Sequence, residues 1–222
     1  MRYSISGEIA QSIRLEFEPG EFAWCSKGSL MAYTPSIQWN LRVPGGLGGA
    51  VRRSLSGEGI ALTYLQTDTP EQHALLSANA PGHLEVWDLE SDGPVTTTRG
   101  SFLCAWGDDL DITVTIARRA GAALFGGAGL FLQTVSGKGT VLVHASGDFS
   151  EHRLVAGEQM LVSTGNLAAF SSEVDYDIQG VGGCRKILFS GEGLFMTRLS
   201  GPGRVLLQTL KRQFGANSAN AA

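Results

Sequence analysis

The sequence feature that most constrains the fold is a short glycine unit, Ser-Gly-x-Gly, which occurs four times. Its copies span 56–59, 136–139, 190–193 and 200–203, and an apolar run follows each copy. Glycine adopts the positive φ angles of tight turns at no steric cost, and the third position varies freely, as at a solvent-facing turn tip. We therefore predict four β-hairpin turns. The turn-forming residues are Gly57, Gly59, Gly137, Gly139, Gly191, Gly193, Gly201 and Gly203.

The same units do not match a nucleotide-binding loop. A Walker A loop requires Gly-Lys followed by Ser or Thr, whereas Gly139 follows Lys138. The dinucleotide fingerprint requires a third glycine at the start of a helix, but each unit here opens an apolar stretch with Leu or Met at that position. We expect neither a nucleotide nor any other cofactor.

Repetition extends beyond the glycine units. Residues 52–66 resemble 185–200, and residues 129–143 resemble 193–207. Short apolar runs also alternate with glycine turns about every 8–12 residues, which is the spacing of β-sandwiches and barrels. We predict one all-β unit built from repeated hairpins. The unit spans 1–210 as two related halves, about 1–118 and 119–210, and a flexible tail follows at 211–222.

One short helix is predicted within residues 69–82. Thr69 can cap its start, Pro70 suits the first turn, and Pro81 follows its end. The apolar content of this stretch is thin, so we expect only one or two helical turns.

The charge pattern argues against nucleic acid as a partner. The formal net charge is −4, and the basic residues occur as isolated pairs rather than as a stripe. Two pairs, Arg52-Arg53 and Arg185-Lys186, precede equivalent glycine units. We take them as the candidate partner surface, which an oligomer could present to acidic proteins or lipid headgroups. Solvated surface ion pairs are the alternative.

We predict a cytoplasmic protein that does not cross a membrane. The longest apolar run, 120–132, falls short of the roughly 20 residues that a membrane helix needs. This run and 43–51 are rich in glycine, and we expect them to contact other subunits or a lipid surface. The odd number of cysteines, three, and the lack of a leader favour a reducing compartment with buried strand thiols.

Residue types that commonly carry catalysis form no constellation in this sequence. His144 and His152 flank an expected turn and could be cross-strand neighbours, but no His-x-His pair is present to bind a metal. The acidic groups at 108–111 and 173–177 fit solvated strand faces, and no Gly-x-Ser-x-Gly motif occurs. We predict no metal, no cofactor and no enzymatic activity.

Five stretches together resemble a known family. They read GEFAWCSKGSLMAY, RRSLSGEG, GGAGLFLQTVSGKGTVLVHASGD, VSTGNLAAF and GEGLFMTRLSGPGRVLLQT, and they cover about 20–210. They look like the altered inheritance of mitochondria family of mitochondrial biogenesis proteins, in its bacterial branch. The resemblance implies a fold similar to the tryptophan RNA-binding attenuation protein. That fold is a double-stranded β-helix type of β-sandwich with two related units per chain, assembled as a homotrimer.

The resemblance implies a fold more than an activity, because the family supplies no established catalytic residues. Its fungal members are linked to organisation of the mitochondrial inner membrane. The RNA binding of the attenuation protein is not expected here, since this chain is acidic and has no basic-aromatic strip.

Three functional hypotheses follow. The first is a non-catalytic assembly or scaffold protein, a homotrimer that acts at a membrane surface. The second is a module that holds a small hydrophobic ligand between its sheets. The tryptophans that would line such a site are Trp24, Trp39, Trp87 and Trp106. The third is an enzyme whose site forms across subunits. The repeated hairpins and the missing catalytic constellation favour the first.

Overall fold

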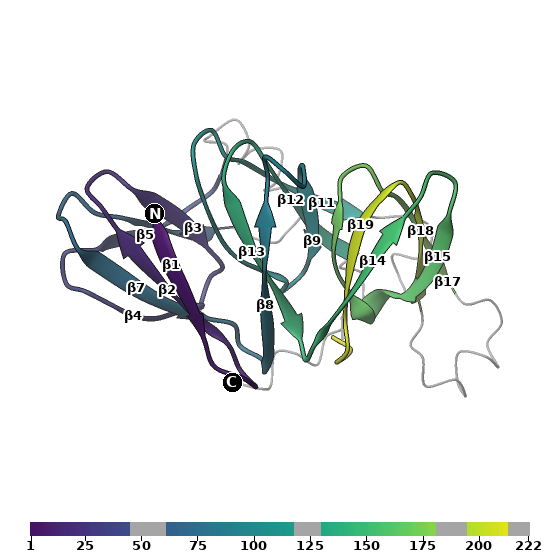
Figure 1. Cartoon of the computed structure of the whole chain (residues 1–222), viewed down its shortest axis with the longest axis horizontal. Helices are drawn as coiled ribbons and strands as arrows, with labels where there is room; N and C mark the ends of the chain where they lie inside the picture. The colour runs from purple at the N-terminus through teal and green to yellow at the C-terminus, as the bar shows by residue number, and fades with distance from the viewer. Residues whose placement is uncertain (45–60, 118–129, 181–194, 213–222) are drawn as a thin grey trace.

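The structure, a computed structural model, describes residues 1–44, 61–117, 130–180 and 195–212. In this part of the chain it consists of antiparallel strands and one short 3₁₀ turn, η2 (Thr164–Asn166), with no α-helix (Figure 1). The all-β prediction is therefore confirmed. The more specific likeness to the attenuation-protein fold stays a prediction.

The strands form three successive repeats of six, preceded by β1 (Arg2–Ser6). The first repeat comprises β2 (Ser12–Phe17), β3 (Phe22–Cys25), β4 (Leu30–Tyr33), β5 (Gln38–Arg42), β6 (Leu62–Gln66) and β7 (Gln72–Ser77). The second comprises β8 (Gly82–Asp88), β9 (Val95–Thr98), β10 (Phe102–Trp106), β11 (Asp111–Ala117), β12 (Leu130–Ser136) and β13 (Thr140–Ser146). The third comprises β14 (Phe149–Leu154), β15 (Gln159–Ser163), β16 (Leu167–Ser171), β17 (Asp175–Gly180), β18 (Phe195–Ser200) and β19 (Gly203–Gln208).

Every repeat pairs its strands in the same way. The first and third strands flank the sixth, and the second and fourth strands flank the fifth. Four sheets result, in the orders β1-β2-β7-β4, β5-β6-β3-β10-β13-β8, β11-β12-β9-β16-β19-β14 and β15-β18-β17. Figure 1 shows them following one another along the long axis of the molecule.

Neighbouring repeats join edge to edge. The second strand of one repeat pairs, antiparallel, with the third strand of the next. We call these two contacts the seams. β3–β10 is the first seam and β9–β16 is the second. The chain therefore contains three repeats rather than the two predicted halves. The predicted boundary near 118 lies inside the second repeat, between β11 and β12.

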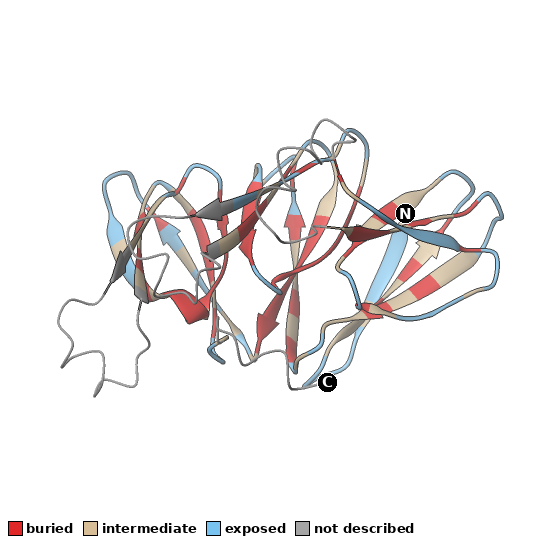
Figure 2. Cartoon of the chain, turned by 180° about the vertical axis from the view of Figure 1, so that it is seen from behind, coloured by how far each residue is buried: buried red, intermediate tan, exposed pale blue. Residues whose placement is uncertain are grey.

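Three apolar core layers separate the successive sheets. The first layer includes Ile13, Leu65 and Leu142, the second includes Trp87, Val135 and Leu206, and the third includes Phe170, Val162 and Leu199. The seam strands β10 and β16 are buried along their whole length. In Figure 2 the buried residues concentrate in the middle of the array, and exposed strand surface appears toward both ends.

The predicted helix within 69–82 is wrong, because this stretch contains β7. Pairing with β2 buries Ala74 and Leu76 on one face, so the apolar residues follow the two-residue period of a strand. Glu71, just before β7, has a φ of 58°, which lies outside the right-handed helical region.

Residues 136–139 and 200–203 do form bends, but they do not form the β-hairpin turns that we predicted. The bend with Gly137 and Gly139 joins β12 to β13, and the bend with Gly201 joins β18 to β19 at Gly203. In each case the two strands belong to different sheets. The units therefore carry the chain from one sheet to the next. The predicted turn residues Gly57, Gly59, Gly191 and Gly193 lie outside the described residues.

Candidate functional site

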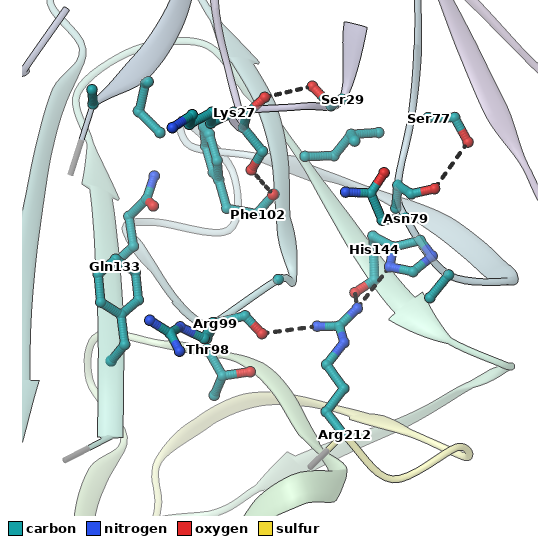
Figure 3. A pocket seen from close by; sticks show the side chains of 18 residues that line it. Lys27, Ser29, Ser77, Asn79, Thr98, Arg99, Phe102, Gln133, His144 and Arg212 are labelled. Carbon is teal, nitrogen blue, oxygen red and sulfur yellow. Dashed lines mark hydrogen bonds between the residues drawn. The ribbon is translucent and has the colours of Figure 1, made fainter. Parts of the chain in front are cut away.

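The candidate site is a cavity of about 610 Å³ at the junction of the first and second repeats. Its lining comes from the turn after β3, the start of β6, the link between β7 and β8, the turn before β10 and the start of β10 itself, and strands β12 and β13. Figure 3 shows Lys27, Gln133, Arg99, Arg212 and His144 placed around this one space.

Arg212 reaches the cavity from the end of the chain. Its backbone N–H donates to the carbonyl of Gly165 (2.9 Å), and its guanidinium donates to Ser146 Oγ (3.0 Å) and Ser101 Oγ. Burial lowers the pKa of Arg212 to about 10. The predicted flexible tail is therefore wrong at its first two positions, 211–212, and the remaining positions, 213–222, lie outside the described residues.

His144 lies on β13 and is almost fully buried. Arg212 Nη2 is 2.7 Å from His144 Nδ1, and since a guanidinium only donates, Nδ1 must be the acceptor. The proton of the neutral ring is therefore on Nε2. Burial, and next the positive charge of Arg212, lowers the pKa of His144 to about 4, so the ring is neutral at pH 7.

This histidine gives the protein a specific acid sensitivity. The pKa of His144 is about 4 when folded and 6.5 ordinarily, so between these values the unfolded chain binds a proton that the folded chain does not. The free energy of unfolding should therefore fall by about 3 kcal/mol as the pH drops from 6.5 to 4. Urea unfolding of wild type and His144→Gln across this range checks it. An unchanged pH profile in the variant would contradict the assignment.

The predicted proximity of His144 and His152 is wrong. His144 is on β13 in the second sheet, opposite Leu84, whereas His152 is on β14 in the third sheet, opposite Val205. Within the described part of the chain, no group of three or more His, Cys, Asp and Glu side chains could hold a metal ion.

The tryptophans suggested as walls of a hydrophobic ligand site do not line the cavity. Trp87 and Trp106 are buried in core layers, and Trp39 is half exposed on β5. Trp24 lies on β3 beside Tyr64, with ring centroids 4.8 Å apart. The candidate partner residues Arg52, Arg53, Arg185 and Lys186 lie outside the described residues.

Two cysteines face each other across the first seam. Cys25 on β3 is opposite Cys104 on β10, and both are free, buried thiols, as predicted. Burial raises the pKa of both thiols, so neither is a nucleophile at neutral pH.

A second charged cluster ties the second repeat to the third. Arg204, buried on β19, donates to Glu85 (2.6 Å) and Asp92 (3.2 Å) of the second repeat and to Glu151 (2.8 Å) of its own repeat. Its guanidinium lies 4.7 Å from the centroid of the Trp87 ring. The hydrogen bond from Arg204 is the main cause that lowers the pKa of Glu151.

Sequence reasoning singled out His144, but as a neighbour of His152, and it missed the cavity and its other residues. Lys27, Gln133, His144 and Arg212 are far apart in the sequence and share no motif, so only the fold brings them together. Three of the four basic pairs do carry a signal for the repeat number. They begin at residues 52, 118 and 185, spaced by 66 and 67 residues, which is one repeat each time.

These features define an all-β protein of three edge-joined repeats with a cation-lined cavity at the first junction. The chain belongs to the family described as mitochondrial biogenesis AIM24, which matches residues 3–210. This confirms the family resemblance. The described part of the chain contains no helix that could span a bilayer.

Two streptococcal proteins are similar to this chain. The uncharacterized protein M6_Spy0233 of Streptococcus pyogenes serotype M6 is 30% identical over 220 residues, which cover 95% of this chain and 86% of that protein. This bacterial relative agrees with the bacterial branch. The crystal structure of protein SPYM3_0169 from Streptococcus pyogenes has a TM-score of 0.78 at 24% identity and covers 95% of this chain and 94% of that one, so the two share a fold.

Proposed function

We propose that this protein is a non-catalytic, cytoplasmic assembly protein that forms a homotrimer by joining copies head to tail. The observation that carries the proposal is the repeat topology. Each seam within the chain pairs a second strand with a third strand. At the two ends of the array, the third strand of the first repeat, β4, and the second strand of the third repeat, β15, are edge strands.

The surface of β4 supports this pairing. Each third strand has a bulge at the same place, with Met31 in β4, Leu103 in β10 and Ala168 in β16. Leu103 and Ala168 are buried in the seams, whereas Met31 is 61% exposed. Two residues further along, Ala105 and Phe170 are buried, whereas their counterpart Tyr33 is 43% exposed. Both exposed side chains would be covered by a further repeat.

The surface of β15 also supports this pairing, because a residue exposed on β15 has a buried counterpart on β9. Thr96 of β9 lies opposite Thr134 of β12, and Leu161 of β15 lies opposite Arg198, which is 64 residues after Thr134. Leu161 is therefore the counterpart of Thr96, which is buried against Phe170 in the second seam. Leu161 itself is 60% exposed.

These equivalences fix the expected register between two copies. Because Thr96 pairs with Phe170, Leu161 of one copy should pair with Tyr33 of the next, in antiparallel strands. Such head-to-tail contacts either close into a ring or continue as a filament. The closed ring of three copies is the form that the family resemblance implies. The ring would also cover the two end strands β4 and β15, so that neither could pair with a strand of an unrelated chain.

A membrane surface or an acidic partner is proposed as the target of the assembly. The segments 45–60, 118–129 and 181–194 each follow the fourth strand of a repeat, and each carries one basic pair among apolar and glycine residues. Nine such segments in a trimer would repeat the same short basic and apolar sequence pattern. Repeated basic charge binds anionic headgroups by adding about 1 kcal/mol for each Lys or Arg near the surface.

Leu161→Asp is expected to convert the trimer into monomers. An aspartate at the centre of this strand pair would leave a charge desolvated opposite Tyr33. The variant should fold normally, because Leu161 is exposed in a single chain. Ile9→Asp is the matched control, since Ile9 is 79% exposed in the turn between β1 and β2. Size-exclusion chromatography with light scattering measures the number of chains. A monomeric wild type, or a trimeric Leu161→Asp variant, would contradict the proposal.

A further inference from the structure

Two buried side-chain donors at the first junction have unmet hydrogen-bonding capacity. Among the described residues, no acceptor meets hydrogen-bond geometry at Gln133 Nε2 or His144 Nε2, although the backbone carbonyls of Ala80 and Gly100 also act on the His144 ring, and both residues are more than nine-tenths buried. Both residues line the cavity. A buried donor left unpaired costs about 1–3 kcal/mol, so an acceptor in the cavity would recover that free energy.

The third repeat shows the same two positions with their hydrogen bonds made. Thr197 is the counterpart of Gln133, 64 residues later, and it hydrogen-bonds Thr164 (2.9 Å). Gln208 is the counterpart of His144, and its side chain accepts from Ser146 N (3.0 Å) and donates to the Gly165 carbonyl (2.8 Å). At the equivalent positions of the third repeat these hydrogen bonds are made, although Arg204 Nε at the second junction also has no partner among the described residues.

The charge of the cavity is one-sided. Lys27, Arg99 and Arg212 line it, and none of the described lining residues is a carboxylate. Arg212 donates only to neutral acceptors, namely hydroxyl groups, backbone carbonyls and the His144 ring. Among the described residues no carboxylate pairs with Arg212 or Lys27. The guanidinium of Arg212 is largely buried, and a buried cation is normally paired with an anion, so an anionic ligand would supply the negative charge that Arg212 lacks among the described residues.

We propose that this cavity binds a small amphiphilic anion, with an oxyanion head group among Lys27, His144 and Arg212 and an apolar body against Phe131 and Leu103. Oxyanion oxygens accept from the unmet donors and neutralise the cations. The volume of about 610 Å³ lies within the range of small-molecule sites and exceeds what an inorganic anion fills. The apolar part of the lining selects an organic ligand.

Calorimetric titration of the full chain with octanoate tests the proposal. Octanoate should bind with one molecule per chain. Octanol, which has the same apolar body without the charge, and inorganic phosphate, which has charge without the body, should each bind at least about tenfold more weakly. In proton–nitrogen spectra, the Nε2–H signal of His144 should shift with octanoate.

A pair of lysine variants distinguishes octanoate binding in this cavity from a general effect of removing one positive charge. Lys27 and Lys138 are both exposed, so neither Lys27→Met nor Lys138→Met should impair folding. Lys27→Met should weaken octanoate binding about tenfold, and Lys138→Met, far from the cavity at the β12–β13 bend, should leave it unchanged. The proposal is overturned if octanoate does not bind, if octanol or phosphate binds equally well, or if the two variants behave alike.

Discussion

Replacing Arg204 with methionine is expected to lower the free energy of unfolding by about 3 kcal/mol. Arg204 is buried and bonds three carboxylates, Glu85, Asp92 and Glu151, which belong to two different repeats. Removing the guanidinium leaves these negative charges close together with no cation between them. The carboxylates are about one-third exposed, so water offsets part of the repulsion and holds the loss near the lower end of the range for buried pairs.

The matched control for this variant is Arg153→Met. Arg153 also pairs with Glu151 (3.2 Å), but its side chain is 71% exposed, so its loss should cost less than about 1 kcal/mol. Urea unfolding at fixed protein concentration measures both variants. Glu151 has a lowered pKa when folded, so its pairing stabilises the protein above pH 4.5 and is lost as the pH falls below it. The difference between wild type and Arg204→Met should shrink at pH 4. Equal losses in the two variants would refute the role given to Arg204.

Replacing Gly139 with alanine should lower the free energy of unfolding by about 2–6 kcal/mol. Gly139 has a φ of 143°, a backbone conformation that alanine rarely adopts. A Cβ there would lie 2.8 Å from Gly107 Cα and would overlap the carbonyl oxygen of Trp106. The two chain segments that change sheets, after β10 and before β13, cross at this point. The loss combines about 1–3 kcal/mol for the sparsely populated backbone conformation with about 1–3 kcal/mol for overpacking.

Gly157→Ala separates the two contributions. Gly157 has a φ of 83°, but nothing lies within 4 Å of the position that its Cβ would occupy. This variant should lose only the conformational part, about 1–2 kcal/mol. Thermal or urea unfolding of both variants gives the difference, which is the contribution of the crossing. If Gly157→Ala is as destabilised as Gly139→Ala, the close approach of the two segments is not what requires glycine.

The all-β class was predictable because local patterns determine it. Ile13, Leu15 and Phe17 alternate with polar residues in β2, and all three are buried. The positive φ of Gly137 was predictable for the same reason. The sheets that a glycine turn connects are set by long-range pairing. A Ser-Gly-x-Gly unit therefore predicted a bend but not whether the following strand would return to the same sheet.

The number of repeats was harder to predict from the sequence. The first repeat has no Ser-Gly-x-Gly unit between its fifth and sixth strands, where Thr67–Glu71 makes the connection instead. The cavity was not predictable, because Arg212 and His144 are 68 residues apart and meet only when β13 and the segment after β19 pack together. Gln133 and His144 matter because they are buried in this cavity, and their burial likewise depends on the fold rather than on a local sequence pattern.

The most direct test of head-to-tail assembly is a cross-link between copies in the predicted register. Chains carrying Tyr33→Cys are mixed with chains carrying Leu161→Cys, both in a Cys184→Ser background, and oxidised. Residues directly opposite in antiparallel strands have Cβ atoms about 4.5–5.5 Å apart, close enough for a disulfide after a small adjustment. We predict a disulfide-linked pair of chains in the mixture, little product from either variant alone, and less product when Gln159→Cys replaces Leu161→Cys. Efficient linking of Tyr33→Cys chains to each other, or no linking in the mixture, would contradict head-to-tail assembly.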